Sequence, residues 1–294
     1  MTLCFFYNYS YSGYKVQAEL FGFDHWRMYI GSDEYQGPEP MTPQQLAERI
    51  TKAKSLVVLT GAGVSTEAGL PDFRGPNGLY TTGHYDPERV FEINYFRSHP
   101  GMFFEFSLDL MNLLEKVQPT FTHRFLAELE NRGLLDRIIT QNIDTIHQMA
   151  GSRKIIEIHG SYWSGRCLHC GKTESQLDLN WWKAKMQTNL SDPVVRCEIC
   201  GGVFKPDVVF FGENVHGMSE AQHFAVQCDL MLVLGSSLTV YPAAALPQLC
   251  RGFVAVVNKG PVELTPNHNR VIIQSKLDDF FKDVAETMDL RVDG

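Results

Sequence analysis

The chain has 294 residues, of which 44% are hydrophobic and 20% are charged. This balance is typical of a globular protein and excludes a disordered, collagen-like or coiled-coil chain. With 26 Lys and Arg against 34 Asp and Glu, the formal net charge of −8 disfavours a protein that binds a nucleic-acid backbone, since such proteins usually carry a basic face. The length allows one large domain or one domain with inserts.

Residues 1–40 form a segment with a composition of its own, in which eleven aromatic residues fall within the first 35 positions. Aromatic and polar residues alternate from Phe5 to Tyr11, which predicts a small β-hairpin that turns near residues 12–13; a partly disordered tail is the alternative. Residues 37–40 are typical of a linker. We expect this N-terminal extension to serve packing or assembly, and its deletion to leave the chemistry of the protein intact.

The N-terminus does not have the basic start and continuous apolar run of a secretory signal peptide. The longest apolar runs, such as 56–59 and 231–234, have the length of a buried strand, far below the roughly 20 residues that a membrane helix needs. We therefore expect a cytoplasmic protein with no membrane partner.

From position 41 the pattern changes to helices and strands. Thr42 and Pro43 are typical of a helix start, and the apolar spacing predicts a helix up to Lys54. Residues 55–60 form an apolar run that predicts a buried strand and leads directly into the glycine-rich residues 61–69. A strand, a glycine turn and a helix form a dinucleotide-binding arrangement; because the spacing is not GxGxxG, an ordinary strand-to-helix turn is the alternative.

Further apolar runs predict buried strands, and helical patterns separate several of them. The strands are expected at residues 137–140, 154–158, 208–211, 230–234, 253–257 and 271–274, and the helices at 119–132, 218–228 and 277–288. This alternation predicts an α/β fold with a Rossmann-like, doubly wound and mostly parallel sheet. Polar residues or glycines follow nearly every strand, so we expect the strand ends to converge on one ligand cleft.

Four of the seven cysteines form two CxxC pairs, Cys167 with Cys170 and Cys197 with Cys200. This spacing is typical of a zinc ribbon, because each turn brings two thiolates to one tetrahedral ion. Four thiolates leave no open position, so we expect one structural Zn²⁺; two disulfides or chance pairing are the alternatives. The patterns around Cys4, Cys228 and Cys250 indicate small buried apolar residues.

Two segments interrupt the alternation of strands and helices. One carries the cysteine pairs, and the other carries an apolar helical pattern. We therefore expect a main domain over residues 41–294 in which a small zinc-ribbon and helical part is inserted into the Rossmann-like domain. The large part is then made of residues 41–77, 119–160 and 203–294, with a helical insert at 78–118 and a zinc-ribbon insert at 161–202.

Seven motifs occur in order along the main domain. They are GAGVSTEAGLPDFRG (61–75), TQNIDTIH (140–147), IHGS (158–161), the two CxxC pairs, KPDVVFFGE (205–213), GSSLTVYPAA (235–244) and VNKG (257–260). Their order and spacing resemble the sirtuin family of NAD-dependent protein lysine deacylases, over about residues 41–290. The resemblance implies that NAD binds the Rossmann-like domain and that an acyl-lysine protein or peptide enters between this domain and the zinc ribbon.

By this resemblance, the cofactor NAD contacts several of these motifs. The implied contacts are Gly61, Ala62, Gly63 and Ser65 at the pyrophosphate; Gly235, Ser236 and Ser237 opposite them; Asp72, Phe73 and Arg74 in a flexible loop; Gln141, Asn142, Ile143 and Asp144 at the nicotinamide and its ribose; and Asn258 at the adenosine ribose, followed by Lys259. Backbone N–H groups and hydroxyls suit an anion, and a carboxamide needs both the donors and the acceptors that Asn and Asp supply.

The resemblance implies that His159 is the catalytic base, with Asn142 and Asp144 beside the reacting sugar. In the family's mechanism the acyl oxygen attacks the anomeric carbon of the nicotinamide ribose, nicotinamide leaves, and the histidine accepts a proton from the ribose hydroxyls. The acyl group ends on ADP-ribose. An imidazole with a pKa of about 6.5 suits this role at physiological pH. A histidine satisfied by the backbone at a strand end is the alternative.

The resemblance also implies that the substrate pairs as a β-strand between residues 208–213 and 237–241. The implied substrate contacts are Val209, Phe211, Gly212, Glu213 and Val240. Val209 and Phe211 would line an apolar tunnel for the acyl-lysine stem, and an ordinary core strand is the alternative for residues 208–211.

The residues that would surround the acyl group indicate a preference. Desuccinylase-like family members carry a Tyr and an Arg close together in the helical insert, whereas residues 102–110 contain no such pair. We therefore expect acetyl or longer apolar acyl groups to be removed in preference to succinyl.

Two other functions stay open. The first alternative is that the protein uses the same pocket as a protein ADP-ribosyltransferase or an NAD hydrolase. His159 together with the 205–213 motif favours deacylation over both. A binding protein whose zinc ribbon contacts nucleic acid is the other alternative, and the net charge of −8 argues against it.

Overall fold

The larger of the two sheets in the described residues contains six parallel strands. The computed structural model describes residues 41–70 and 85–293, so the predicted hairpin within residues 1–40, Cys4 and the loop residues Asp72, Phe73 and Arg74 lie outside the described residues. The strands are β1 (Leu56–Thr60), β2 (Arg137–Thr140), β3 (Ile155–Glu157), β7 (Leu230–Leu234), β8 (Phe253–Asn258) and β9 (Arg270–Gln274).

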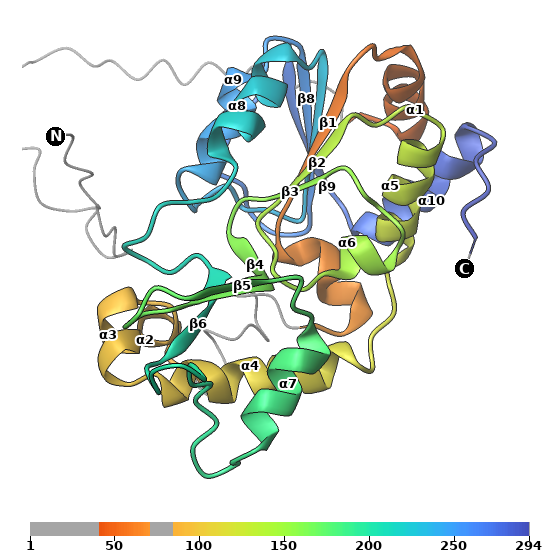
Figure 1. Cartoon of the computed structure of the whole chain (residues 1–294). Helices are drawn as coiled ribbons and strands as arrows, with labels where there is room; N and C mark the ends of the chain where they lie inside the picture. Colours follow the sequence, from red (N-terminus) through yellow and green to blue (C-terminus); the bar gives the residue numbers. More distant parts are fainter. Residues whose placement is uncertain (1–40, 71–84, 294) are drawn as a thin grey trace, which may run out of the picture. The chain divides into compact units, whose positions relative to one another are not determined.

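The order of these strands is β3-β2-β1-β7-β8-β9 (Figure 1). Counted along the chain within this sheet, this is the order 3-2-1-4-5-6 of dinucleotide-binding folds, and it reverses between β1 and β7. The predicted α/β class with a Rossmann-like parallel sheet is confirmed.

Helices cover both faces of the large sheet, and β1 and β7 are buried at every position. Alternate residues of a strand point to opposite faces. Val58 therefore packs with one group of helices, whereas Val57 and Leu59 pack with the other (Figure 1). The first group is α1 (Pro43–Lys52), α5 (Phe121–Asn131) and α10 (Leu277–Thr287), and the second is α8 (Met218–Gln227) and α9 (Leu246–Leu249).

Side chains fix where two helices of the first group begin. Thr42 Oγ1 accepts a hydrogen bond from Gln45 N (3.2 Å) and Gln45 Oε1 accepts one from Thr42 N (2.9 Å), which is a capping box at the start of α1. At the start of α5, the carboxylate of Asp278 from α10 accepts hydrogen bonds from Phe121 N and Thr122 N at 2.9 Å each. The first turn of α5 is thereby joined to α10.

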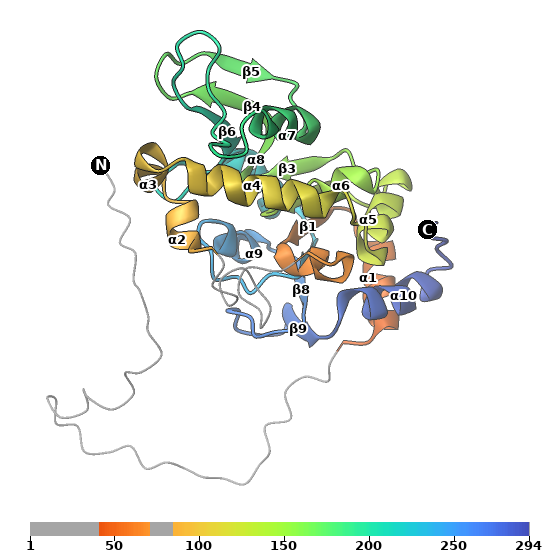
Figure 2. The same ribbon diagram turned by 90° about the horizontal axis from the view of Figure 1, so that it is seen from below.

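The smaller sheet is antiparallel, in the order β5-β4-β6. Its strands are β4 (Gly160–Cys167), β5 (Thr173–Ser175) and β6 (Phe204–Val208), and α7 (Leu179–Gln187) packs on it. Between β1 and α5 in the chain lie α2 (Pro87–Val90), α3 (Ile93–Ser98) and α4 (Gly101–Leu114). Figure 1 and Figure 2 both show α4 next to α7, and the two helices are in contact.

One hydrophobic cluster joins α2–α4 to the small sheet. We term it the aromatic core, and its large aromatic members are Phe91, Phe96, Phe103, Phe104, Phe106, Tyr162, Trp182, Phe204 and Phe210. Phe210, which follows β6, packs its ring 4.8 Å from Phe103 and 5.0 Å from Phe96. Tyr162 of β4 meets Ser107 of α4 with their hydroxyls 2.9 Å apart. Residues from two distant parts of the sequence therefore share a single core.

The predicted elements of the large sheet agree with the structure to within two residues at each end. The predicted strand over residues 208–211 is wrong, because β6 ends at Val208 and lies in the smaller sheet. The apolar residues after Val208 differ in burial: Phe210 packs in the aromatic core, whereas the Phe211 side chain is 46% exposed.

The remaining short elements are η1 (Ala62–Ala68), α6 (Ile146–Met149) and η2 (Ala243–Ala245). η1 is a 3₁₀ helix, so the glycine-rich turn after β1 leads into 3₁₀ rather than α-helical structure. Within residues 41–70 and 85–293, none of the helices has both the length and the apolarity of a membrane span.

Candidate active site

The loops after β1 and β7 meet where the strand order reverses. Gly61 N donates to the Leu234 carbonyl (3.0 Å), and Gly63 N donates to the Gly235 carbonyl (2.9 Å). A Cβ on Gly63 would lie 2.7 Å from Gly235 Cα, and Gly235 itself has a φ of 63°. The close approach of these two loops therefore requires glycine at both positions.

The residues that follow β2 reach both glycine loops. Gln141 Nε2 donates to Ser236 Oγ (3.0 Å), and Asn142 Nδ2 lies 3.3 Å from the Gly61 carbonyl. Ile143 packs into the aromatic core instead. The ends of β1, β2 and β7 are thus joined by hydrogen bonds of Gln141 and Asn142, two residues that the sequence analysis predicted to contact NAD.

Asp144 is buried next to the loop after β1. Its Oδ2 accepts from Ser65 Oγ (2.6 Å) and Asn142 Nδ2 (3.2 Å), and its Oδ1 accepts from Ile146 N (3.0 Å). Burial raises the pKa of this carboxyl, and the hydrogen bonds that it accepts oppose the shift. Ser65, Asn142 and Asp144 form one hydrogen-bonded group, which we term the Ser65–Asp144 cluster.

His159 lies between β3 and β4, at the junction of the two sheets. Its Nδ1 is 2.9 Å from the Gln141 carbonyl. Because a carbonyl only accepts, Nδ1 carries the proton in the neutral ring, and the lone pair of Nε2 is left to accept one. Burial lowers the pKa of His159, which the contact with Gln141 partly offsets.

The predicted residues after β7 and β8 lie at the same end of the sheet. Ser237 Oγ is 3.0 Å from Thr239 Oγ1, and Gly235 N donates to the Val257 carbonyl (3.1 Å), which joins the two strand ends. Asn258 Nδ2 donates to the Gly260 carbonyl (3.0 Å), so its amide closes the turn after β8.

Two further predicted residues have their main chains engaged in these loops. The carbonyl of Lys259 accepts from Gln274 Nε2 (3.2 Å). The carbonyl of Val240 accepts from Ala244 N (2.9 Å), and the Val240 side chain is half-buried.

Residues 205–213 connect the small sheet to the site. Val209 N donates to the His159 carbonyl (2.8 Å), and Phe211 N donates to the Phe91 carbonyl (2.7 Å). Val209 is half-buried, whereas Gly212 is exposed and has a φ of 94°. This segment therefore runs from β6 past the backbone of His159.

A buried ion pair lies within this segment. Lys205 Nζ is 2.8 Å from Glu213 Oε2, and the side chain of Lys205 is 2% exposed. Burial lowers the pKa of Lys205, and the charge of Glu213 opposes that shift. The sequence analysis assigned no role to Lys205; its signal there is a lysine set among Phe204, Pro206 and the apolar residues that follow.

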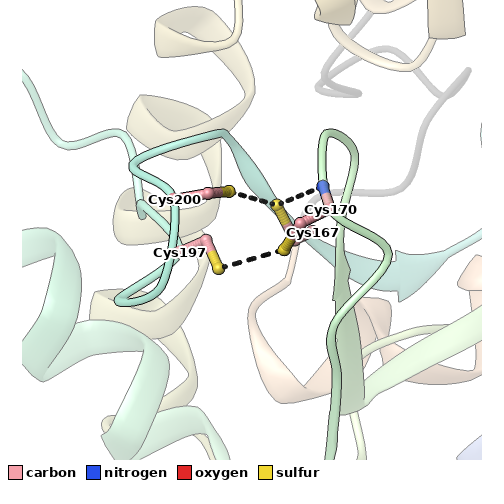
Figure 3. A group of neighbouring side chains, drawn as sticks. All are labelled: Cys167, Cys170, Cys197 and Cys200. Atoms are coloured by element: carbon pink, nitrogen blue, oxygen red, sulfur yellow. Dashed lines mark hydrogen bonds between the residues drawn. The ribbon is translucent and has the colours of Figure 1, made fainter.

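The four cysteines of the CxxC pairs come together (Figure 3). Their Sγ atoms all lie within 4.8 Å of one another, with Cys167 and Cys200 at 3.5 Å and Cys170 and Cys197 at 3.7 Å. Tetrahedral zinc with Zn–S bonds of about 2.3 Å places its sulfurs about 3.8 Å apart. The donor set and its spacing therefore fit one Zn²⁺ ion.

The turns of both pairs have the backbone conformation expected of such a site. Gly171 and Gly201, which follow the pairs, have φ values of 75° and 71°. A Cβ on Gly202 would lie 3.2 Å from Cys167 Sγ. By contrast, Cys228 and Cys250 are buried in the large domain, as predicted.

Family comparison agrees with this arrangement of motifs. The model of the Sir2 family matches residues 61–242, which is more than half of the chain. The chain belongs to the Sir2 family, the sirtuins. The resemblance found in the sequence is therefore confirmed.

Individual sirtuins match nearly the whole main domain. The NAD-dependent protein deacetylase of Sulfolobus acidocaldarius is 38% identical over 243 residues, which cover 82% of this chain and 93% of that protein. The NAD-dependent protein deacylase 2 of Archaeoglobus fulgidus is 39% identical over 254 residues, covering 84% of this chain and 97% of that one.

Solved structures show the same fold. A Sir2 enzyme with 38% sequence identity superposes with a TM-score of 0.74, covering 84% of this chain and 97% of that one. A Sir2 enzyme bound to a propionylated peptide, with 33% identity and a TM-score of 0.73, covers 85% of this chain and all of that one.

Behind the site, this sirtuin holds a histidine network that the sequence analysis did not assign. His147 Nε2 lies 3.0 Å from Thr60 Oγ1, Thr60 donates to Thr140 Oγ1 (2.9 Å), and Thr140 accepts from Asn142 N (3.0 Å). The ring of His123 is 4.7 Å from that of His147. Burial lowers the pKa of both histidines, so they stay neutral. The network fixes the backbone at the start of the Ser65–Asp144 cluster.

Proposed function

We propose that this sirtuin removes acetyl or longer apolar acyl groups from protein lysine side chains. In the overall reaction, acyl-lysine, NAD and water give lysine, nicotinamide and O-acyl-ADP-ribose. The observation that carries the proposal is His159, whose proton is held on Nδ1 by the Gln141 carbonyl, so that Nε2 is free to accept one next to the cofactor motifs. The names of the relatives, NAD-dependent protein deacetylase and deacylase, support the same reaction.

The two glycine loops support a pyrophosphate site at the point where the strand order reverses. Ligands of open α/β sheets bind at the carboxyl ends of the strands there. Gly61, Gly63 and Gly235 leave no side chain between a ligand and the main chain. The hydroxyls of Ser236 and Ser237 stand on the β7 side, where they suit an anion.

The Ser65–Asp144 cluster supports a carboxamide site. Among the described residues nothing donates to Asn142 Oδ1, so this oxygen remains available to the amide N–H of nicotinamide. The Asp144 carboxyl, whose pKa burial raises, accepts from Ser65 and Asn142 and so holds both in place.

His159 serves as a proton acceptor once the ribose is attacked. The acyl oxygen bonds to the anomeric carbon while the bond to nicotinamide breaks, and the electron pair leaves with nicotinamide. Nε2 of His159 then takes the proton of the ribose hydroxyl that attacks the acyl carbon. The neutral ring that this step needs is favoured by the lowered pKa of His159.

The 205–213 segment supports strand-like pairing with the substrate. Val209 and Phe211 carry apolar side chains in the chain segment directly after β6, and Val240 lies in the loop after β7. Helix α4 offers buried phenylalanines near this segment, and none of its residues is cationic. A succinyl carboxylate would find no partner on that helix, which favours apolar acyl groups. Sir2 structures with acetylated and propionylated peptides support this size range.

We assign the metal site a structural role. Cys167, Cys170, Cys197 and Cys200 would hold one Zn²⁺ ion, which cross-links the two turns of the small domain and leaves no open position for substrate. These thiols must be reduced to bind zinc, which supports a cytoplasmic location.

Mass spectrometry of the products tests the proposal. The zinc-loaded protein is incubated with NAD and a panel of acetyl-, decanoyl- and succinyl-lysine peptides. We expect O-acyl-ADP-ribose and nicotinamide from the first two peptides and much less from the third. Faster removal of succinyl would contradict the proposed acyl pocket.

The His159→Ala variant tests the role of the base. Loss of a general base lowers turnover by roughly 10²–10⁴-fold, so we expect acyl-peptide-dependent nicotinamide release to fall by that amount while NAD and zinc remain bound. Unchanged NAD consumption in this variant, or nicotinamide release that needs no acyl peptide, would indicate an NAD hydrolase or ADP-ribosyltransferase instead.

A further inference from the structure

Lys205 is a buried cation at the start of the 205–213 segment. Its Nζ donates to the carbonyls of Val208 (2.6 Å) and Pro206 (3.2 Å). It also lies 2.8 Å from Glu213 Oε2 and 4.1 Å from the centre of the Phe210 ring. Because a lysine is almost never fully buried unless it is paired, these contacts are what allow the charge to stay in the protein interior.

Glu213 completes a closed arrangement of the segment. The same Oε2 accepts from Phe210 N (3.1 Å), and Oε1 accepts from Arg166 Nη2 (3.0 Å) on β4. Lys205 and Glu213 are the first and last residues of the segment, so their ion pair joins its two ends. The carbonyls and the amide that they bind lie between those ends and are held toward the interior.

This arrangement determines which backbone groups face outward. Val209 N and Phe211 N are used by the carbonyls of His159 and Phe91. Within the described ranges, the Val209 carbonyl and the Gly212 N–H make no hydrogen bond, and the Phe211 side chain beside them is 46% exposed. An extended peptide that adds to a sheet edge needs such unpaired main-chain groups.

We propose that Lys205 is a positioning residue for the acyl-lysine substrate: through Glu213 and the Val208 carbonyl it holds the 205–213 segment in the shape that pairs with the peptide. This inference rests on the proposed deacylase function and adds to it a residue that does not itself touch the substrate. Its effect falls on peptide binding, because the predicted NAD contacts lie in the loops after β1, β2, β7 and β8.

Other ion pairs of the small domain provide a contrast. In the pair of Lys185 and Glu198, the side chains are 37% and 79% exposed. Exposed pairs of this kind contribute little, because water screens both charges. Lys205 differs since its acceptors include two carbonyls of the substrate-pairing segment itself, and these lose their partner when the ammonium is removed.

Steady-state kinetics of Lys205→Met test the inference. Met keeps the length and apolar stem of the side chain but removes the charge. We expect the KM for an acetyl-lysine peptide to rise about tenfold, which corresponds to the loss of one good interaction, while kcat and the dissociation constant of NAD stay within about twofold. Glu213→Gln should raise the peptide KM as well, but by less, because Lys205 keeps its two carbonyl acceptors there. The double variant should lose less than the sum of the two single variants, because the two residues share one contact.

Controls separate this result from a loss of fold and from failure of the proposed function. Lys185→Met should match the wild type in all three constants, and zinc content should be equal in every protein. If Lys205→Met does not fold, Lys205→Gln takes its place, because Glu213 is itself an implied substrate contact and its variant cannot isolate the effect of Lys205. A peptide KM that is unchanged, or a fall confined to kcat, overturns the inference. A wild type without peptide-dependent nicotinamide release would instead overturn the deacylase function.

Discussion

The imidazole of His159 combines two properties that a proton acceptor needs. The Gln141 carbonyl, 2.9 Å away, fixes the proton on Nδ1, and burial lowers the pKa so that the ring is neutral. Both come from the junction between β3 and β4, where the chain passes from the large sheet into the small one. The ring is therefore ready to accept a proton without a carboxylate partner on its other nitrogen.

The pH dependence of kcat/KM should reflect this environment. A lowered pKa keeps Nε2 unprotonated at lower pH, so the acid limb of the profile moves to lower pH. We expect kcat/KM for an acetyl-lysine peptide to stay on its plateau down to the ordinary histidine pKa of about 6.5 and to fall only below it. Nicotinamide release measured from pH 5 to 8, with zinc content checked at each pH, tests this. An acid limb centred above pH 7 would contradict it.

The sequence predicts which residue is the proposed base but not which of its ring nitrogens carries the proton. The IHGS motif pointed to His159, whereas its tautomer depends on the Gln141 carbonyl, 18 positions away in the chain. Lys205 and the His123–His147 pair were not assigned, because the contacts that bury a polar residue come from neighbours in space, which the sequence pattern does not show.

At the scale of elements, the loops after β1 and β7 depend on each other. Their glycines are in contact, and a Cβ on Gly61 would lie 2.8 Å from the Gly235 carbonyl oxygen. The position of each loop, and with it Ser65 and Ser236, is therefore set by the other. The parallel pairing of β1 with β7 from Leu56 to Thr60 brings the two loops to the same end of the sheet.

Gly63→Ala should disturb this contact. The new Cβ would meet Gly235 Cα at 2.7 Å, and because a Cβ is fixed to its own Cα and Gly235 Cα is a main-chain atom, the loops must separate. We expect a loss of about 1–3 kcal/mol of stability, as for other overpacked sites, and weaker NAD binding. Gly101→Ala is the matched control, since a Cβ there meets nothing within 4 Å. Thermal unfolding and NAD titration of both variants test this, and equal behaviour of the two would contradict it.

The strands of the large sheet were predictable because each contains a short apolar run, and β1 and β7 are buried at every position. The small sheet was not: β4 contains glycines, serines and an arginine, and β6 contains Lys205 and Pro206, so neither has a strand pattern. At residues 208–211 the error was the reverse, because an apolar run predicted a buried strand where the structure has almost none. This run is apolar because some of its residues fill the aromatic core while Phe211 stays at the surface, and not because the chain is a buried strand there.

At the scale of the molecule, the helices α2 to α4 and the segment with the four cysteines share one hydrophobic core. The aromatic core contains residues of α2, α3 and α4 together with residues of β4, α7 and β6. Cys167 and Cys197 belong to the same cluster, so the group of four cysteines borders that core. Apolar residues of both segments are therefore buried in one shared core.

Removal of zinc should therefore affect more than the two cysteine turns. We expect a chelator to loosen the aromatic core, to change the fluorescence of Trp182, which is 1% exposed, and to abolish deacylation, while the large sheet keeps its secondary structure. Cys197→Ser should behave in the same way, and Cys228→Ser, in the large domain, should not. Fluorescence, circular dichroism and activity before and after zinc is restored test this, and full activity without metal would contradict it.

The order of elements along the chain has a consequence for synthesis on the ribosome. β1 emerges first, the helices α2, α3 and α4 of the aromatic core come before β2 and β3, the remaining core segments β4, α7 and β6 follow, and β7, β8 and β9 come last. Until β7 arrives, the apolar strand β1 has only one neighbour, and its other edge is open. Unpaired strand edges of this kind promote aggregation in partly made chains. The small sheet and the aromatic core are then complete while the large sheet is only half built.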